Sequence, residues 1–137
     1  MMAAAMFVAP TSIQCADFAS AMARNDIAGA KALTIGDAEV NPDIAKDIGR
    51  KTLPFEALAF WVKTCRISPS MSKQYEGFYH LWWNCGTEVR KDGVTWRRMV
   101  RVFLVPSGKG VQLKNLMKGN FPDFTSESEL RAEDVNG

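Results

Sequence analysis

The residues with chemical potential gather in one short segment, YHLWWNC (Tyr79–Cys85), which holds the only histidine of the chain. An imidazole exchanges protons near neutral pH, so His80 is a candidate general base. In the same reaction, Tyr75 or Tyr79 is the candidate hydrogen-bond donor to the substrate. These residues predict one alternative function, a small lyase or isomerase. The other interpretation of His80 is a core histidine with one hydrogen-bond partner.

Cys65 and Cys85 form a candidate disulfide. If the turn QYEG (74–77) has an odd number of residues centred on Tyr75, facing residue numbers in the flanking strands sum to 150, as 65 and 85 do. Facing Cα atoms of antiparallel strands lie about 4.5–5.5 Å apart, within disulfide reach. An even-membered turn would put the two thiols on opposite faces. The alternative is two buried free thiols, which are ordinary in a cytosolic protein.

Metal and cofactor sites are not predicted. Cys65, Cys85 and His80 fall short of the four ligands of a structural zinc site, and the sequence has no glycine-rich phosphate-binding loop. The net charge of +2 on 137 residues is too small to indicate nucleic acid or an acidic membrane as partner.

The two ends of the chain differ from its middle. Residues 1–10 carry no charge and resemble the apolar part of a signal peptide, too short to span a membrane. Cleavage after Cys15 or Ala16 would make 1–16 a signal peptide and the protein periplasmic or secreted. No Lys or Arg precedes Arg24, so the alternative is an apolar start to the first helix of a cytoplasmic protein. The tail Lys118–Gly137 holds two basic and five acidic residues, a charge of −3 against +5 for the rest. It is expected to be mobile or drawn to the basic body.

Helical patterns precede strand patterns. Apolar residues at helical spacing predict helices in 17–34, with a break at Asn25–Asp26, and in 41–49 and 53–65. From Arg66 the period becomes two, which predicts a proline-bearing edge strand in 66–73 and long strands in 78–89, 94–105 and 110–117. The expected fold is α+β, one domain over 17–117 with its helices on a curled antiparallel sheet of about four strands.

Three motifs carry a family resemblance: FASAMARNDIAGAKAL, FEALAFWV and RVFLVPSGKGVQLKNL. In this order they resemble the nuclear transport factor 2-like superfamily, a cystatin-like α+β cone. The resemblance implies a pocket between helices and sheet. Enzymes of that superfamily use inward carboxyl groups with tyrosine, a histidine pair or an Asp-Arg-Asp set, and none of these can be assembled from this chain. The departures favour a protein that is not an enzyme.

The pairing of the two longest strands predicts the faces of the sheet. With the turn centred on Asp92, facing numbers sum to 184, so His80 would face Leu104, Trp82 would face Val102, and Trp83 would face Arg101. The expected ligand-binding pocket, on the helix-facing side, comprises Trp61, Phe78, His80, Trp82 and Val102. The expected homodimer interface, on the other side, comprises Trp83, Arg101 and Phe103, because a monomer would leave their aromatic rings in water.

The predicted function is therefore a non-enzymatic envelope or secreted domain that binds an apolar small ligand or a protein partner. The lyase or isomerase with His80 as base is one alternative. An intracellular dimeric interaction module is the other.

Overall fold

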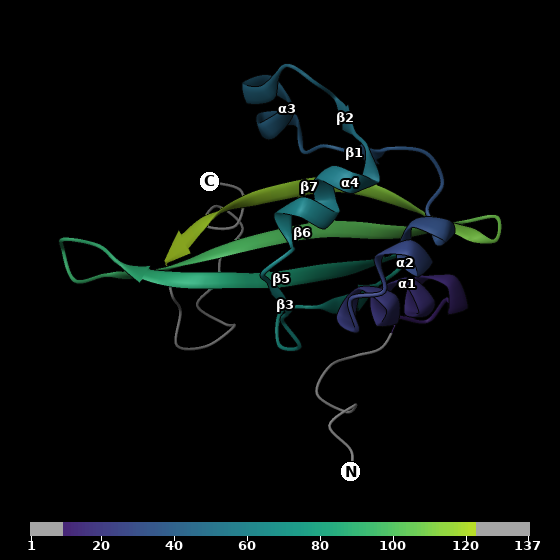
Figure 1. Ribbon diagram of the computed structural model, residues 1–137, viewed down its shortest axis with the longest axis horizontal. Coiled ribbons are helices and arrows are strands. Elements are labelled where there is room, and N and C mark those ends of the chain that lie inside the picture. The colour runs from purple at the N-terminus through teal and green to yellow at the C-terminus, as the bar shows by residue number, and fades with distance from the viewer. Residues whose placement is uncertain (1–9, 123–137) are drawn as a thin grey trace, which may run out of the picture.

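The computed structural model describes residues 10–122 and confirms an α+β architecture (Figure 1). Its helices are α1 (Ile13–Ala23), α2 (Ile27–Leu33), α3 (Pro42–Ile48) and α4 (Phe55–Trp61). Its main sheet contains β3 (Arg66–Ile67), β4 (Lys73–Tyr75), β5 (Phe78–Val89), β6 (Thr95–Ser107) and β7 (Gly110–Pro122). The strands β1 (Ala38–Glu39) and β2 (Thr52–Leu53) pair with each other beside α3.

Local sequence signals explain the helix ends. The Asp26 side chain accepts a hydrogen bond from the Gly29 backbone N–H and starts α2, so the predicted break after α1 is confirmed. Asn41 caps α3 in the same way, and Gly49 ends α3 in the left-handed conformation at φ +71°. Helix α4 is shorter than the predicted 53–65.

The main sheet is antiparallel and open, in the order β3–β5–β6–β7, with β4 also paired to β5. The predicted edge strand is thus split into two short pieces along β5. The expected curl is not present: the long strands form a twisted open sheet with α1, α2 and α4 on one face (Figure 1). The segment between α2 and α3 runs along β7, where the Ile35 N–H donates to the Val111 carbonyl and the Asn41 N–H to the Leu116 carbonyl.

The predicted register of β5 with β6 is correct only near the turn. Val89 faces Thr95 and Gly86 faces Arg98, as expected, but a bulge between Asn84 and Gly86 shifts the pairing by one residue beyond it. His80 therefore faces Phe103, Trp82 faces Arg101, and Trp83 faces Val100. The predicted pairs of His80 with Leu104, Trp82 with Val102 and Trp83 with Arg101 are wrong.

The shift reverses the two faces of β5. Tyr79, Leu81 and Trp83 pack in the main core with Phe18 of α1 and Leu58 of α4. The β6 residues assigned to the helix-facing side do lie in that core. They are Val100, Val102 and Leu104. On the opposite side of the sheet, Trp82, Met99, Met117 and Phe121 form a second cluster.

The predicted domain limits are too narrow at both ends. The boundary at residue 16 falls inside α1, where Ser12 caps the helix and Cys15 is buried in the core. Strand β7 continues to Pro122, five residues beyond the expected end at 117. Most of the predicted signal peptide and tail lies outside the described residues. Within residues 10–122, no helix has the length and apolarity needed to cross a membrane.

Candidate ligand-binding pocket

The disulfide between Cys65 and Cys85 is present, with the two Cα atoms 4.2 Å apart. Arg66 faces Asn84 and Ile67 faces Trp83, which is the predicted register sum of 150. The argument that led to this register, an odd-membered turn centred on Tyr75, is wrong. Tyr75 faces Phe78 across a two-residue turn, an even-membered one that sets a sum of 153 for β4. The facing sums of β3 and β4 against β5 therefore differ by three residues. The segment between β3 and β4 accommodates this difference, so the two thiols lie on the same face of the sheet.

A cavity of about 470 Å³ opens beside this disulfide, between the corner that joins α1 to α2, the end of α4, and β3. We call it the helix–sheet pocket. Its lining is mostly apolar, and Cys65 and Trp83 belong to it. The remaining lining residues are Met22, Ala23, Asn25, Ile27, Ala59, Val62, Lys63, Arg66, Ile67 and Pro69. Its volume lies within the range of about 300–1,000 Å³ that is typical of small-molecule sites.

The charges of the helix–sheet pocket have one sign. Lys63 and Arg66 line it, both exposed to solvent, and the part of its lining that the structure describes contains no Asp or Glu. Two cations beside an apolar surface attract an anionic group whose apolar part is buried. Asn25, also in the lining, has φ +61°, so the chain makes a tight corner at the mouth of the pocket.

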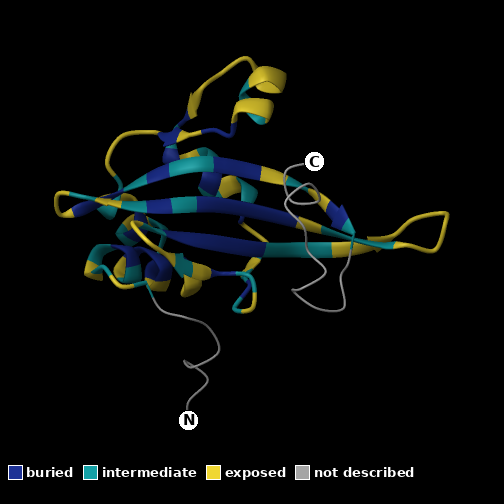
Figure 2. Ribbon diagram, turned by 180° about the vertical axis from the view of Figure 1, so that it is seen from behind, coloured by how far each residue is buried: buried dark blue, intermediate teal, exposed yellow. Residues whose placement is uncertain are grey.

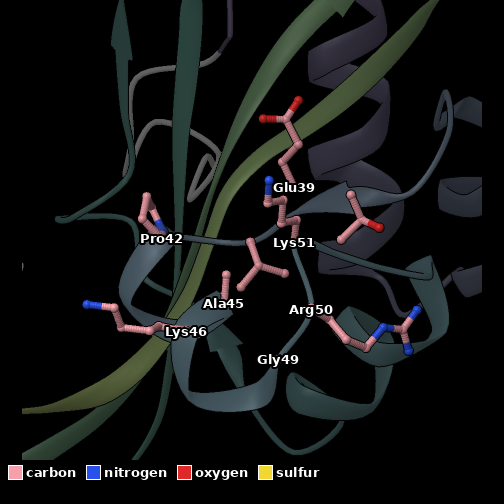
Figure 3. Close-up of a pocket in the computed structure, with 9 residues that line it drawn as sticks. Glu39, Pro42, Ala45, Lys46, Gly49, Arg50 and Lys51 are labelled. Atoms are coloured by element: carbon pink, nitrogen blue, oxygen red, sulfur yellow. The ribbon is translucent and has the colours of Figure 1, made fainter.

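A second, larger hollow of about 750 Å³ lies between α3 and the β1–β2 pair (Figure 3). We call it the α3 groove. Ala45 and Pro42 supply apolar lining, whereas Lys46 and Arg50 point away from Ala45 toward opposite sides. No residue of α3 is buried. Most residues that line the α3 groove are exposed, so the groove is open to solvent and suits a large surface better than a small molecule.

His80 lies on the face opposite the helices, among aromatic rings. Its ring centroid is 4.9 Å from that of Trp82 and 4.6 Å from that of Phe103. Its Nε2 atom is buried and has no hydrogen-bond partner among the described residues. Burial, and secondarily the charge of Arg101, lowers the pKa of His80 to about 3. An imidazole with such a pKa is neutral at pH 7 but is a weak base, because a general base works best with a pKa near the operating pH.

The three residues of the catalytic alternative do not share a site. Tyr75 is on the same face as His80, with ring centroids 6.3 Å apart. Tyr79 points to the helix side, where burial raises its pKa to about 12 and the nearby Ser72 side chain offsets this only in part. The Tyr79 hydroxyl has no hydrogen-bond partner of good geometry among the described residues.

The predicted pocket residues are also divided. Phe78, His80 and Trp82 are on the face opposite the helices, and Val102 is fully buried in the helix-side core. Trp61 is on α4, where the Lys118 ammonium lies 4.6 Å from its ring centroid. Sequence reasoning missed the residues of the helix–sheet pocket. Two features of the sequence could have indicated this pocket. They are the helix break at Asn25–Asp26 and the apolar residues on both sides of Cys65.

The predicted interface residues are separated as well. Trp83 is 2% exposed and belongs to the core beneath the helices, so it is not an interface residue in this fold. Arg101 is buried on the opposite face and Phe103 is partly buried beside it. The dimer was predicted because aromatic rings would otherwise lie in water. This reason does not apply to Trp83, because its ring is buried within the chain.

No group of three or more His, Cys, Asp and Glu side chains in residues 10–122 is arranged to hold a metal ion. The fold and site define an α+β domain with a disulfide-edged pocket between helices and sheet. Comparison with known protein-family models, with curated proteins and with solved structures finds no match for this chain.

Proposed function

We propose that this protein is an extracytoplasmic binding domain that holds a small apolar ligand with an anionic group in the helix–sheet pocket. The observation that carries the proposal is the apolar cavity beside the disulfide, with Lys63 and Arg66 as the charged residues of its lining within 10–122. The apolar lining would bury the body of the ligand, and the two cations would pair with its charged end at the solvent.

The disulfide supports the proposed location. Cytosolic thiols are kept reduced, whereas disulfides persist in the periplasm and outside the cell. The Cys65–Cys85 bond closes the edge strand β3 onto β5 directly beside the pocket, so it would also keep the pocket preformed. A preformed site binds more tightly because less ordering is required on binding.

Membership of the nuclear transport factor 2-like superfamily is part of this proposal. Helices on one face of an antiparallel sheet, with a pocket between them, support it. The open sheet is the feature that fits a cone least well.

Binding of dodecanoate, with dodecanol as the uncharged comparison, tests the proposed function by titration calorimetry. We expect Ala23→Trp, which fills the pocket mouth, to abolish binding, and the exposed α2 substitution Ala28→Trp to leave it unchanged. Lys63→Gln with Arg66→Gln should weaken dodecanoate about tenfold or more and dodecanol little. The matched control is Lys46→Gln with Arg50→Gln in the α3 groove. Equal binding by all variants would refute the proposal, and native mass spectrometry of protein from its own host would show the natural ligand.

The second candidate function is binding of a protein partner at the α3 groove. The observation that favours it is that α3 buries none of its residues and leaves Ile48 42% exposed. Exposed apolar surface next to an open hollow is typical of interaction sites. Ala45→Glu should abolish capture of such a partner while Ala23→Trp retains it. The opposite pattern would assign the partner to the helix–sheet pocket.

Catalysis by His80 and an intracellular dimeric module remain alternatives that the geometry supports less. The low pKa of His80 and the separation of Tyr79 from it weigh against the lyase or isomerase. A homodimer would now use the face of Arg101 and Phe103 without Trp83.

A further inference from the structure

The Cys65–Cys85 disulfide belongs to the wall of the helix–sheet pocket. More than half of the described lining of this pocket comes from one segment, residues 59–69, which runs from α4 through β3. On β5 the lining includes Trp83, which faces Ile67 and is 2% exposed. The pocket therefore keeps its shape only while residues 59–69 stay against β5.

Few interactions hold residues 59–69 against β5. The pairing of β3 covers two residues, Arg66 and Ile67. The Ser68 backbone N–H donates one further hydrogen bond, of 2.8 Å, to the Trp82 carbonyl. The disulfide adds a covalent link to these contacts. Breaking it would leave this wall of the pocket held by a short edge pairing, and such segments open at a low cost in free energy.

The disulfide is accessible to a reductant. Cys65 and Cys85 are both partly exposed. Burial along β5 decreases from Trp83, which is buried, through residues 84–86 to residues 87–89, which are exposed (Figure 2). Cys85 thus lies where β5 leaves the core. Exposed disulfides are the ones that external thiols attack, whereas disulfides sealed in a core are out of their reach.

Cationic side chains flank both cysteines. Lys63 and Arg66 are within two residues of Cys65 in the chain and line the same pocket. The Arg98 guanidinium donates a hydrogen bond of 3.0 Å to the Cys85 carbonyl. Neighbouring cations stabilise a thiolate, so they make a cysteine sulfur a better leaving group and favour the reduced form of a disulfide. This arrangement favours exchange with external thiols.

We propose that the Cys65–Cys85 disulfide is a redox switch of ligand binding, so that the oxidised protein holds the anionic ligand and the reduced protein releases it. The switch rests on the proposed function of the helix–sheet pocket, and its reductant is an external dithiol. One thiolate of the dithiol attacks the Cys85 Sγ atom and forms a mixed disulfide, while the Cys65 sulfur leaves as a thiolate with the electron pair of the broken bond. The second thiol then attacks the mixed disulfide and Cys85 leaves in turn. The dithiol is thereby oxidised to its own disulfide, and the two protons that it loses end on the two cysteines.

Titration calorimetry with dodecanoate, before and after treatment with dithiothreitol, tests the switch. We expect reduction to weaken binding about tenfold or more in the wild type and in Cys15→Ala, within the range of about 5–150-fold that is typical of coupled sites. The double variant Cys65→Ala with Cys85→Ala should bind as weakly as the reduced wild type and should not respond to dithiothreitol. By linkage, saturating dodecanoate should make the disulfide harder to reduce by the same factor. Equal affinity in the two redox states would overturn the proposal.

Hydrogen exchange measured without ligand distinguishes a failed switch from a failed binding site. After reduction, residues 59–69 should exchange about tenfold faster or more, whereas residues 110–117 of β7 should be unchanged. Unchanged exchange in 59–69 would overturn the switch. Equally faster exchange in both segments would mean global unfolding and would overturn it as well. If the oxidised protein does not bind dodecanoate, the proposed function fails, and faster exchange in 59–69 alone still supports opening of the pocket by reduction.

The rate of reduction tests the role of the cations. Dithiothreitol is the probe because it has no fixed charge. Lys63→Gln with Arg66→Gln should slow the reduction several-fold, whereas the matched control, Lys46→Gln with Arg50→Gln in the α3 groove, should be reduced at the wild-type rate. Equal rates in all three proteins would show that the charges do not favour exchange and would overturn that step of the proposal.

Discussion

The Cys65–Cys85 disulfide should stabilise the fold by about 3 kcal/mol. It joins residues 20 positions apart. On the chain-entropy treatment, closing a loop of that length removes about 11 cal/mol/K from the unfolded chain, which is about 3 kcal/mol at 25 °C. For a domain of this size the loss of that free energy corresponds to a melting temperature about 10 °C lower.

The structure gives a reason for a loss of that size. Strand β3 contains two residues and pairs only with β5, so few backbone hydrogen bonds hold it without the disulfide. The bulge of β5 against β6 begins at Asn84, the partner of Arg66, so Cys85 has no facing residue on β6 and β5 is less regularly paired beside β3. We therefore expect the reduced protein to lose β3 pairing first and to open the helix–sheet pocket.

Urea unfolding of the wild type with and without reductant measures the effect, alongside Cys65→Ala, Cys85→Ala and the double variant. Each single substitution breaks the bond, so the double variant should be no more than about 1 kcal/mol less stable than either single one. Cys15 is a free, buried thiol and supplies the control: Cys15→Ala should remain sensitive to reductant.

Intact mass after alkylation in denaturant checks the pairing itself. Unreduced full-length protein should take up one label, at Cys15, and reduced protein three. Three labels in unreduced protein purified from the periplasm would refute the disulfide and remove the main support for the proposed location. Additive losses in the two single variants would show that packing, rather than the cross-link, is the origin of the stability.

Three further predictions follow from the described residues. His80 has a pKa of about 3 when folded and about 6.5 when unfolded, so the unfolded chain binds the proton first as the pH falls. The contribution of neutral His80 to the free energy of unfolding is complete above about pH 6.5 and is lost toward pH 3. Between about pH 7 and pH 5, the free energy of unfolding of the wild type should fall by about 2 kcal/mol relative to that of His80→Phe. Parallel pH profiles of the two proteins would contradict this. Trp83→Glu should cost more than about 4 kcal/mol and unfold the domain in circular dichroism, whereas the control Phe60→Glu, at a position 73% exposed, should cost less than about 0.5 kcal/mol. Gly86→Ala should cost about 1–2 kcal/mol in urea unfolding, because φ is +125° and a Cβ would lie 2.6 Å from the Arg98 side chain; an unchanged midpoint would show that the bulge does not need glycine.

Signals that act within a few residues determined much of this fold. Asp26, Asn41 and Gly49 mark helix ends because a side-chain oxygen or a left-handed glycine satisfies the terminal backbone groups locally. The change in the spacing of apolar residues at Arg66, from helical spacing to alternation, separated the helices from the strands. This signal is also local, because the direction of each side chain depends on the local backbone geometry. The sequence also identified the disulfide partners, although the turn that was meant to align them has an even number of residues.

The faces of β5 were decided by tertiary structure. Both faces of that strand are aromatic, so the alternation pattern is equally compatible with either orientation. A single bulge at Asn84–Gly86 then reversed the assignment, so that Trp83 lies in the core and His80 and Trp82 lie on the face opposite the helices. The helix–sheet pocket arises in the same way. It joins residues near positions 25, 63 and 83, which only the packing of α1, α4 and β3 on the sheet brings together.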